Sequence, residues 1–421
     1  MSTKVKWTTS FPAHWDIVPA KRLFPESKTR AAEEDEQLSA TQSYGVISQS
    51  EFMHLAGRKV VQLNTNQHLR KRVEIGDFVI SMRSFQGGLE RAWAAGGIRS
   101  SYVVLKPHPN LNIGYYQYFF KSTEYIQALQ STANFIRDGQ DMSYQDFILI
   151  DLPLPPYNEQ KIIAAFLNYE ISRIDKLVAK QQQLIELLKE KRQAVISHAV
   201  TKGLNPDVPM KDSGVEWLGD VPKHWKCGYL RWYISVSSGT YLNNKDFETD
   251  ESNDCINPVI GGNGVMGFTS KINDENCLIV GRVGALCGNV HQIRRACWVT
   301  DNALKISYGC DFDVDYLEMY LKVLDLNKLA NHNAQPLITG TMIKEQVAII
   351  PSIDEQKNIT KFIQSKVGKI DLLIQKSSEA VDKIKERRTA LISAAVTGKI
   401  DVRDWVAPDT QNAEELQEAT A

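Results

Sequence analysis

Long apolar runs are absent from the 421-residue sequence, since none approaches the ~20 consecutive apolar residues that a membrane-spanning helix requires. The first 15 residues mix lysine, threonine and aromatic side chains and hold no apolar stretch of signal-peptide length. These two absences predict a cytoplasmic location without a membrane partner.

Cysteine is scarce and widely spaced. The six cysteines all lie between Cys227 and Cys310, no two form a CxxC pair, and at least nine residues separate any neighbours. Neither a disulfide framework nor a zinc site is therefore predicted. Walker, HExxH and GxSxG motifs are also missing. His14 and His224 have no metal or catalytic partner at a suitable spacing, so we interpret both as packing residues.

The chain has no excess of positive charge. Its 49 Lys and Arg residues balance 50 Asp and Glu residues, which leaves a formal net charge of −1. Residues 1–150 are slightly basic, whereas residues 205–347 and the stretch after Arg403 are acidic. Phosphate contacts depend on local clusters, because salt screens the field of distant charges within ~10 Å. The composition argues against indiscriminate nucleic-acid binding and leaves sequence-specific binding open.

The sequence contains an internal repeat. Residues 155–201 align without gaps with residues 351–397, and 19 of the 47 aligned positions are identical, where chance gives about three. A second match joins two opening segments, which read PAHW at residues 12–15 and PKHW at residues 222–225. The chain therefore consists of two copies of a three-part unit, in which an opening segment is followed by a variable region and a helical region.

The repeated region predicts two long helices with a coiled-coil pattern. Apolar residues recur at heptad positions a and d over residues 171–199 and 367–395, with polar interruptions at matching places. This match favours packing of the two helices on each other over packing of each on its own domain. An unbroken helix would span ~60 Å, and a break near Tyr169 or Ser365 stays open. The expected interface residues are Ile174, Val178, Ile185 and Leu188 in the first helix and Ile370, Ile374, Val381 and Ile384 in the second.

The variable regions, roughly residues 16–150 and 226–347, share a rhythm and little sequence. Residues 74–83 and 275–282 each read as a turn, a buried strand and a basic residue. Glycines, further arginines, a second short strand and a helical pattern follow in both regions. We predict a mixed α/β domain of about 130 residues for each.

Three short motifs suggest cofactor binding or catalysis, but their contexts do not fit. Residues 262–267 match GxGxxG, yet a turn-like stretch follows where a dinucleotide site needs a helix. Residues 257–260 read NPVI and lack the aromatic that stacks on a flipped base in amino-methyltransferases. Asp151 and Glu159 fit a loose magnesium-nuclease pattern. Glu159 is better explained as a first-turn acid that favours the helix dipole.

The repeated segments of the chain resemble those of the specificity subunits of type I restriction-modification systems. The resemblance rests on the two opening segments, the junction GLNP…MKDSGVEWLG within residues 203–219, and the two helical repeats with EQK near their starts. The motifs occur in the family's order and cover nearly the whole chain up to about Arg403. The acidic tail has no counterpart in the family, and the first helix ends Thr-Lys-Gly where the second ends Thr-Gly-Lys.

The resemblance implies a mixed α/β fold with two globular target-recognition domains and an internal pseudo-twofold repeat. The two long helices are expected to pair as an antiparallel coiled coil between the domains. The expected boundaries are 1–150 for the first recognition domain, 151–204 for the first helical spacer, 205–347 for the second recognition domain, 348–403 for the second spacer and 404–421 for a disordered acidic tail.

The resemblance also implies a function without catalysis. Each recognition domain would read one half of a bipartite double-stranded DNA sequence, and the helical spacer would set the gap between the halves. Two modification subunits, which bind S-adenosylmethionine and methylate adenine, would dock on the chain, and ATP-using restriction subunits would join them. S-adenosylmethionine, ATP and Mg are expected on these partners, with no cofactor, metal or catalytic residue on this chain.

Arginine and amide side chains near the predicted strands are the candidates for reading bases. Arginine can donate two hydrogen bonds to guanine, and Asn or Gln can bind adenine in the same way. Each candidate is equally compatible with a solvated surface position. The candidates are Arg83, Gln86, Arg91 and Arg99 in the first domain and Asn263, Arg282, Arg294 and Arg295 in the second.

Two alternatives stay open. One is enzymatic: a specificity module of a type II-like enzyme, or a cryptic Mg-dependent nuclease that uses Asp151 and Glu159. The other is a purely structural coiled-coil adaptor, which would select no DNA sequence.

Overall fold

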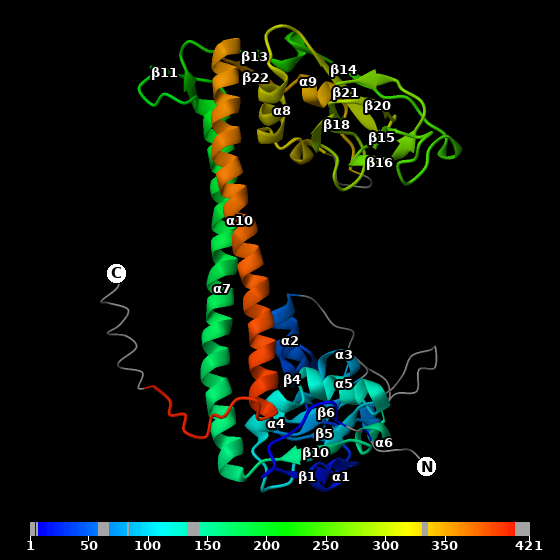
Figure 1. Cartoon of the computed structure of the whole chain (residues 1–421). Coiled ribbons are helices and arrows are strands. Elements are labelled where there is room, and N and C mark those ends of the chain that lie inside the picture. Colours follow the sequence, from blue (N-terminus) through cyan, green and yellow to red (C-terminus); the bar gives the residue numbers. More distant parts are fainter. Residues whose placement is uncertain are drawn as a thin grey trace. The chain divides into compact units, whose positions relative to one another are not determined.

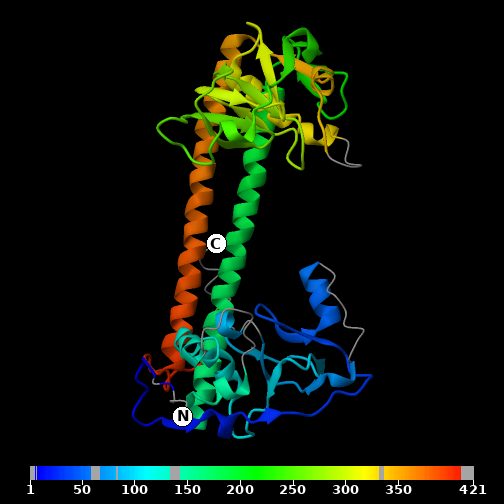
Figure 2. The same ribbon diagram turned by 90° about the vertical axis from the view of Figure 1, so that its right-hand side faces the viewer.

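The computed structural model describes residue 5 and residues 7–57, 67–81, 84–132, 143–330 and 336–408. The chain forms two compact units, Met1–Gln182 with Glu379–Ala421 and Gln183–Ser378. Two long helices, α7 (Tyr157–Lys202) and α10 (Ile353–Val396), contribute one stretch to each unit (Figure 1 and Figure 2). Each unit thus contains one globular domain and part of both helices. No helix within the described ranges is long and apolar enough to cross a membrane.

The domain of the first unit is built around a four-stranded sheet with the order β2-β9-β6-β7. β9 (Val103–Leu105) lies between β2 (Glu26–Ser27) and β6 (Phe78–Ile80), and all neighbouring pairs are antiparallel. Three two-stranded sheets pair β1 (Asp16–Pro19) with β10 (Asp151–Leu154), β3 (Leu38–Thr41) with β4 (Gly45–Ser48), and β5 (Lys71–Val73) with β8 (Gly96–Ile98). The other elements are β7 (Glu90–Arg91), α1 (Ala20–Leu23), α2 (Gln49–Ala56), a 3₁₀ turn (Gln67–Leu69), α3 (Ser84–Gly87), α4 (Ile113–Phe119), α5 (Thr123–Thr132) and α6 (Tyr144–Phe147).

The domain of the second unit contains a sheet of the same order and direction, β14-β21-β18-β19. β21 (Ala303–Tyr308) lies between β14 (Ile234–Ser238) and β18 (Leu278–Gly281), again antiparallel to both. A second sheet, β16-β15-β20-β17, has no four-stranded counterpart among the described strands of the first unit. The other elements are β11 (Met210–Asp212), β12 (Asp220–Pro222), β13 (Lys226–Tyr229), β15 (Asn257–Gly261), β16 (Gly264–Thr269), β17 (Asp274–Glu275), β19 (Val290–Gln292), β20 (Ala296–Val299), β22 (Val347–Ile350), α8 (Val314–Val323), α9 (Gly340–Lys344) and 3₁₀ turns at Leu230–Trp232, Asn244–Asp246 and Leu326–Leu329.

The two predicted strands occupy equivalent places in these sheets. β6 falls within residues 74–83 and β18 within residues 275–282, and each pairs with the predicted second strand, β9 or β21. A buried strand flanked by turn residues was therefore recognisable in both regions, although their sequences differ. The expected mixed α/β fold with two domains and paired long helices is confirmed.

Each domain shares its apolar core with both long helices. In the first unit, aromatic side chains such as Phe24 and Phe78 belong to one buried cluster with Leu167 of α7 and Val396 of α10. In the second unit, strand and helix residues of the domain form one cluster with Val200 of α7 and Ile359 of α10. A domain that loses these contacts would expose much of its own core.

Both long helices are continuous, over 46 residues in α7 and 44 in α10, so the breaks that the sequence left open do not occur. Gly203 and Gly398 follow the helix ends with φ of +81° and +71°, a left-handed conformation that favours glycine. A Cβ atom at either glycine would lie 3.2 Å from the ring of Trp225 or Trp15. Close packing of these tryptophans therefore also favours glycine at both ends.

Burial along the helices follows the heptad pattern. From Ile171 to Val195 in α7, every residue at position a or d is buried or half-buried and every other residue is exposed. α10 shows the same pattern from Val367 to Leu391, apart from the half-buried Ala380. The eight predicted interface residues all occupy such positions. This stripe is narrow, as in a two-helix coiled coil.

The helices run antiparallel in the first unit. Phe166 and Tyr169 of α7 contact Trp405, which follows the end of α10. Further along α7, Asp175 Oδ1 accepts a hydrogen bond of 2.8 Å from Arg388 Nε, earlier in α10. Residue numbers in α10 thus fall as those in α7 rise.

The second unit shows the same direction. Arg192 Nε of α7 donates a hydrogen bond of 2.8 Å to Asp371 Oδ1 of α10. Gly203, beyond the end of α7, lies beside Glu355 near the start of α10. The ion pair of this unit is the repeat equivalent of the ion pair in the first unit, with the roles of α7 and α10 exchanged.

Candidate nucleic-acid interface

Two histidines tie the opening segments to the long helices. His14 Nε2 lies 2.9 Å from Glu159 Oε2 in the first turn of α7, and His224 Nε2 lies 3.0 Å from Glu355 Oε2 in the first turn of α10. The histidine side chains are 44% and 53% exposed. The prediction that they are packing residues was wrong, because it is the tryptophan after each histidine that is buried.

The acidic residues of the nuclease alternative have structural partners. Glu159 binds His14, as described above. Asp151 lies in β10 opposite Pro19, and its carbonyl oxygen accepts a hydrogen bond of 2.7 Å from Trp7 Nε1. Among the described residues, no group of three or more His, Cys, Asp or Glu side chains is arranged to hold a metal ion.

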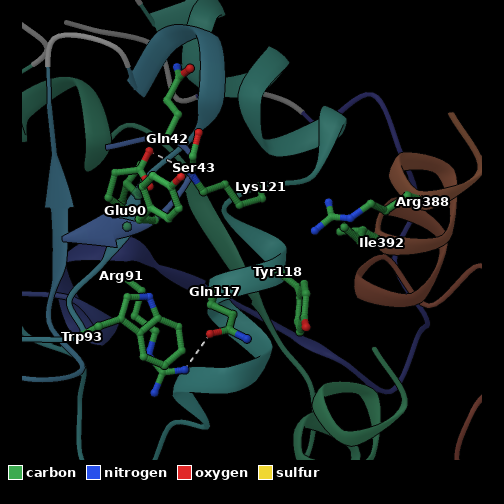
Figure 3. A pocket seen from close by; sticks show the side chains of 13 residues that line it. Gln42, Ser43, Glu90, Arg91, Trp93, Gln117, Tyr118, Lys121, Arg388 and Ile392 are labelled. Carbon is green, nitrogen blue, oxygen red and sulfur yellow. Dashed lines mark hydrogen bonds and ion pairs between the residues drawn. The ribbon is translucent and has the colours of Figure 1, made fainter. Parts of the chain in front are cut away.

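An open pocket of about 220 Å³ lies in the first unit, between the domain and α10 (Figure 3). The β3–β4 turn, β7 and α4 provide most of its walls, and α10 contributes Arg388 and Ile392. Figure 3 shows Arg91, Trp93 and Gln117 close together on one side of this pocket. A candidate DNA-binding residue, Arg91, therefore lines a surface hollow that a ligand can reach.

Arg91 is held by neutral groups. Its Nη1 donates a hydrogen bond of 2.6 Å to Gln117 Oε1, and its guanidinium carbon lies 4.1 Å from the centre of the Trp93 ring. Partial burial lowers the pKa of Arg91 from its ordinary value. Its Nε is buried and finds no hydrogen-bond acceptor in the described part of the chain. A guanidinium with few water contacts interacts more strongly with an incoming acceptor.

A buried ion pair supports the same pocket. Glu90 is 2% exposed, and its Oε1 accepts a hydrogen bond of 2.7 Å from Lys121 Nζ. Lys121 Nζ also donates to the carbonyl oxygen of Gly87 at 2.8 Å. Burial raises the pKa of Glu90, while the ammonium group of Lys121 opposes that rise. Lys121, two residues beyond the end of α4, thus connects this segment to β7 and to the last residue of α3.

The other candidates of the first domain differ in their surroundings. Gln86 is exposed on α3, beside the pocket, since a Cβ atom on the adjacent Gly87 would lie 2.6 Å from the side chain of Gln42 in the β3–β4 turn. Arg99 is exposed after β8. Arg83 lies outside the described residues.

In the second domain, Arg282 also binds neutral groups. Its Nη1 lies 3.3 Å from both Ser238 Oγ and the carbonyl oxygen of Asp301. The exposed Asn263 sits in the β15–β16 turn. The preceding Gly262 packs against the backbone of the residue that follows Arg282, which brings this turn close to the arginine. Asn263 and Arg282 thus form a second group of candidates.

Arg294 and Arg295 are bound by carboxylates. Arg294 Nη2 lies 2.6 Å from Asp315 Oδ1, and Arg295 Nη1 lies 3.6 Å from Glu251 Oε1. A carboxylate partner neutralises an arginine locally and competes with phosphate for its donors. Arg91 and Arg282 have no carboxylate ion pair within the part of the chain that the structure describes, so they keep their charge for a ligand.

Comparison with curated proteins finds several relatives of one kind, although no family model matches the chain. The EcoprrI type I restriction enzyme specificity subunit of Escherichia coli is 28% identical over 147 residues, which are 35% of this chain and 36% of that subunit. The EcoKI specificity subunit of Escherichia coli K12 is 23% identical over 328 residues, which are 70% of this chain and 68% of that subunit. The chain is thus similar, over most of its length, to type I restriction enzyme specificity subunits.

A solved structure supports the fold of the chain. A chain from a study of the assembly and conformational transition of a type I restriction-modification system superposes with a TM-score of 0.71 and 13% identity. The superposition covers 93% of the present chain and all of the other. The resemblance first inferred from the opening segments and helical repeats is thus confirmed.

The sequence alone did not reveal the partners of these arginines. Trp93 stands only two residues after Arg91, so an aromatic side chain near this arginine could have been noticed in the sequence. Gln117 and Ser238 come from distant elements, 26 and 44 residues from the arginines they contact. No local pattern connects residues at such separations.

The GxGxxG motif of the chain forms part of a hairpin. Residues 262–267 lie in the turn between the antiparallel strands β15 and β16 and in the second of these strands. Gly264 has φ of +103°, which the turn requires. The motif therefore opens no helix that could bind a pyrophosphate, as its sequence context predicted.

Proposed function

We propose that the chain recognises a bipartite double-stranded DNA sequence within a type I restriction-modification complex, each domain reading one half. The observation that carries the proposal is a half-buried arginine in each domain, Arg91 and Arg282, held by neutral partners. Such an arginine keeps its charge for phosphate, and its fork can donate two hydrogen bonds to guanine. The net charge of −1 fits reading by a few placed side chains.

The paired helices would set the gap between the two half-sites. In each unit the two helices pack through buried or half-buried a and d positions, and one ion pair joins them. Two modules that contact one face of a duplex reach segments about one helical turn apart, ~34 Å. A fixed spacer would therefore select one gap over others.

Two methyltransferase subunits would dock on the helices. Leu177 and Leu373 are repeat equivalents at positions outside the a and d stripe, and they are 45% and 51% exposed. Leu184, Leu187 and Leu372 add exposed apolar side chains. Apolar surface of this kind favours a protein partner, and a duplicated position suits two copies of one partner.

The chain itself would carry out no chemistry. Methyltransferase subunits would supply S-adenosylmethionine, and restriction subunits would supply ATP and Mg. The whole complex would act in the cytoplasm, where it would defend the cell against incoming DNA such as that of a phage.

Selection from a random double-stranded DNA library tests the proposal. The full chain, alone and with its methyltransferase subunits, is incubated with the library, and the bound DNA is sequenced. We expect enrichment of two short motifs separated by a constant gap. A protein that binds without enriching any sequence would instead be a structural adaptor.

Activity assays address the enzymatic alternative. The purified chain is incubated with Mg²⁺, S-adenosylmethionine and DNA in the absence of other subunits. We expect neither cleavage nor methyl transfer. Either activity from the chain alone, lost on Asp151→Asn or Glu159→Gln, would replace the proposed role with an enzymatic one.

A further inference from the structure

In each unit, two hydrogen-bonding residues join the domain to the two long helices. They are Tyr115 with Gln160 in the first unit and Tyr316 with Gln356 in the second, and we call each pair a helix anchor. All four side chains are at most 1% exposed. Gln160 and Gln356 are repeat equivalents, and so are the residues whose carbonyl groups the two tyrosines bind.

In the first unit, the anchor links α4 to both helices. Gln160 Oε1, in the first turn of α7, accepts a hydrogen bond of 2.9 Å from the backbone N–H of Asn112, the N-cap of α4. Gln160 Nε2 donates a hydrogen bond of 2.8 Å to the carbonyl oxygen of Pro155. The hydroxyl of Tyr115, in α4, donates a hydrogen bond of 2.9 Å to the carbonyl oxygen of Val396, the last residue of α10.

The second unit repeats this arrangement with the helices exchanged. Gln356 Oε1, in the first turn of α10, accepts a hydrogen bond of 2.7 Å from the backbone N–H of Asp313, the N-cap of α8. From α8, the hydroxyl of Tyr316 lies 3.1 Å from the carbonyl oxygen of Val200, in the last turn of α7, and 3.3 Å from that of Ile349. Each anchor thus forms hydrogen bonds at the start of one long helix and at the end of the other.

These bonds are directional, whereas the surrounding core is not. Apolar packing attaches a domain to the helices but resists a small rotation weakly, because it depends on buried area. A hydrogen bond weakens steeply as its angle falls. The carbonyl groups in the last turn of a helix lack intrahelical partners, so a buried tyrosine hydroxyl there both satisfies a carbonyl and defines a direction.

We infer that the helix anchors are positioning residues that make the gap between half-sites a sharply selected quantity. The inference rests on the proposed function. One added base pair moves a half-site by ~3.4 Å and turns it by about a tenth of a helical turn. A domain that is held rigidly on the helices cannot shift or rotate with the displaced half-site. A domain that can rotate on the helices still binds the displaced half-site, and its base preference stays unchanged.

Two double variants isolate the anchors. Tyr115→Phe with Tyr316→Phe removes the hydroxyls that reach the helix ends. The matched control, Tyr116→Phe with Tyr320→Phe, removes buried hydroxyls from the same two helices. Their acceptors, the carbonyl oxygens of Pro153 and Val347 at 2.9 and 2.5 Å, lie in strands of the same domain.

The readout is the affinity of the full chain, with its methyltransferase subunits, for DNA carrying the selected half-sites at the best gap and at gaps one base pair shorter or longer. We expect the preference for the best gap to fall at least about threefold in the anchor variant and to stay within about twofold in the control. Base preference within each half-site should be unchanged in both. Equal gap preference in both variants would overturn the inference.

A second measurement needs no DNA. Hydrogen exchange of the backbone amides in the last turns of α7 and α10 should be at least about threefold faster in the anchor variant than in the control. Equal exchange would also overturn the inference. A wild-type chain that selects no split sequence with a constant gap would contradict the proposed function. A wild-type chain that selects such a sequence, but whose gap preference is the same in the anchor variant, would contradict the anchor inference alone.

Discussion

The helical copies and the recognition domains have diverged to very different extents. The helical copies retain 19 identical residues in 47, and their contacts are duplicated, as the equivalent ion pairs Asp175–Arg388 and Arg192–Asp371 show. The domains keep the strand order of one sheet and little sequence. The guanidinium of Arg91 stacks on the ring of Trp93, whereas that of Arg282 contacts the hydroxyl of Ser238 and the carbonyl oxygen of Asp301.

This difference separates assembly from specificity. A substitution in the long helices alters helix-helix contacts, which occur in both units, so it should affect assembly of the whole protein. A substitution on the surface of one domain alters contacts that the other domain lacks, so it should affect one half-site.

Breaking the helix pair should abolish assembly. Ile185→Asp with Ile384→Asp places carboxylates at two half-buried heptad positions, each at a cost of roughly 2–3 kcal/mol of stability. We expect loss of the complex with methyltransferase subunits in size-exclusion chromatography. Gln183→Asp with Lys383→Asp, at exposed positions of the same helices, serves as the control and should assemble normally. A full complex from the first variant would refute the spacer role.

Removing one of the two candidate arginines should affect one half-site. Arg282→Ala should weaken or relax recognition of one half by ~1–3 kcal/mol, and Arg91→Ala should do so for the other. Competition binding against DNA with each half mutated in turn measures this. Arg294→Ala, which removes an arginine already bound to a carboxylate, should have a smaller effect. Equal loss across unrelated sequences would mark Arg91 and Arg282 as phosphate contacts.

Removing the tryptophan beside Arg91 should have an intermediate effect. Trp93→Ala eliminates the ring under the guanidinium, a contact worth about 0.5–1 kcal/mol at an exposed site, and we expect two- to fivefold weaker binding of one half-site. Trp93→Phe keeps a ring and should retain most of the affinity. Identical losses in both variants would show that stacking plays no part.

The duplicated ion pairs should contribute little and equally. Arg192→Ala and Arg388→Ala each remove one partly exposed pair, worth about 0–1 kcal/mol. Thermal unfolding of the two variants should give small and matching decreases in Tm. A large decrease in only one would show that the two copies of the helix contact are not equivalent.

The fold was largely predictable from sequence because its main signals are periodic. A heptad pattern carried by two matching copies predicted the antiparallel helix pair, and turn-flanked buried strands predicted β6 and β18. The continuity of the helices was not predictable, since the polar residues at Tyr169 and Ser365 fit a helix or a break equally well. The histidine prediction failed because Glu159 and Glu355 lie more than 100 residues from their partners.

The candidate site was predictable only in part. Residue type and position after a strand singled out Arg91 and Arg282. The same rule also selected Arg294 and Arg295, whose carboxylate partners Asp315 and Glu251 come from other elements. Whether a surface arginine is neutralised depends on tertiary contacts, and no local spacing reveals them.

Sequencing of methylated bases in the source cell tests the central claim most directly. DNA from cells with the wild-type chain, with Arg91→Ala and with Arg282→Ala is compared. We predict adenine methylation at a two-part motif with a constant gap, in which each variant relaxes a different half and leaves the other intact. A single uninterrupted motif, or one variant relaxing both halves, would contradict reading by two separate domains.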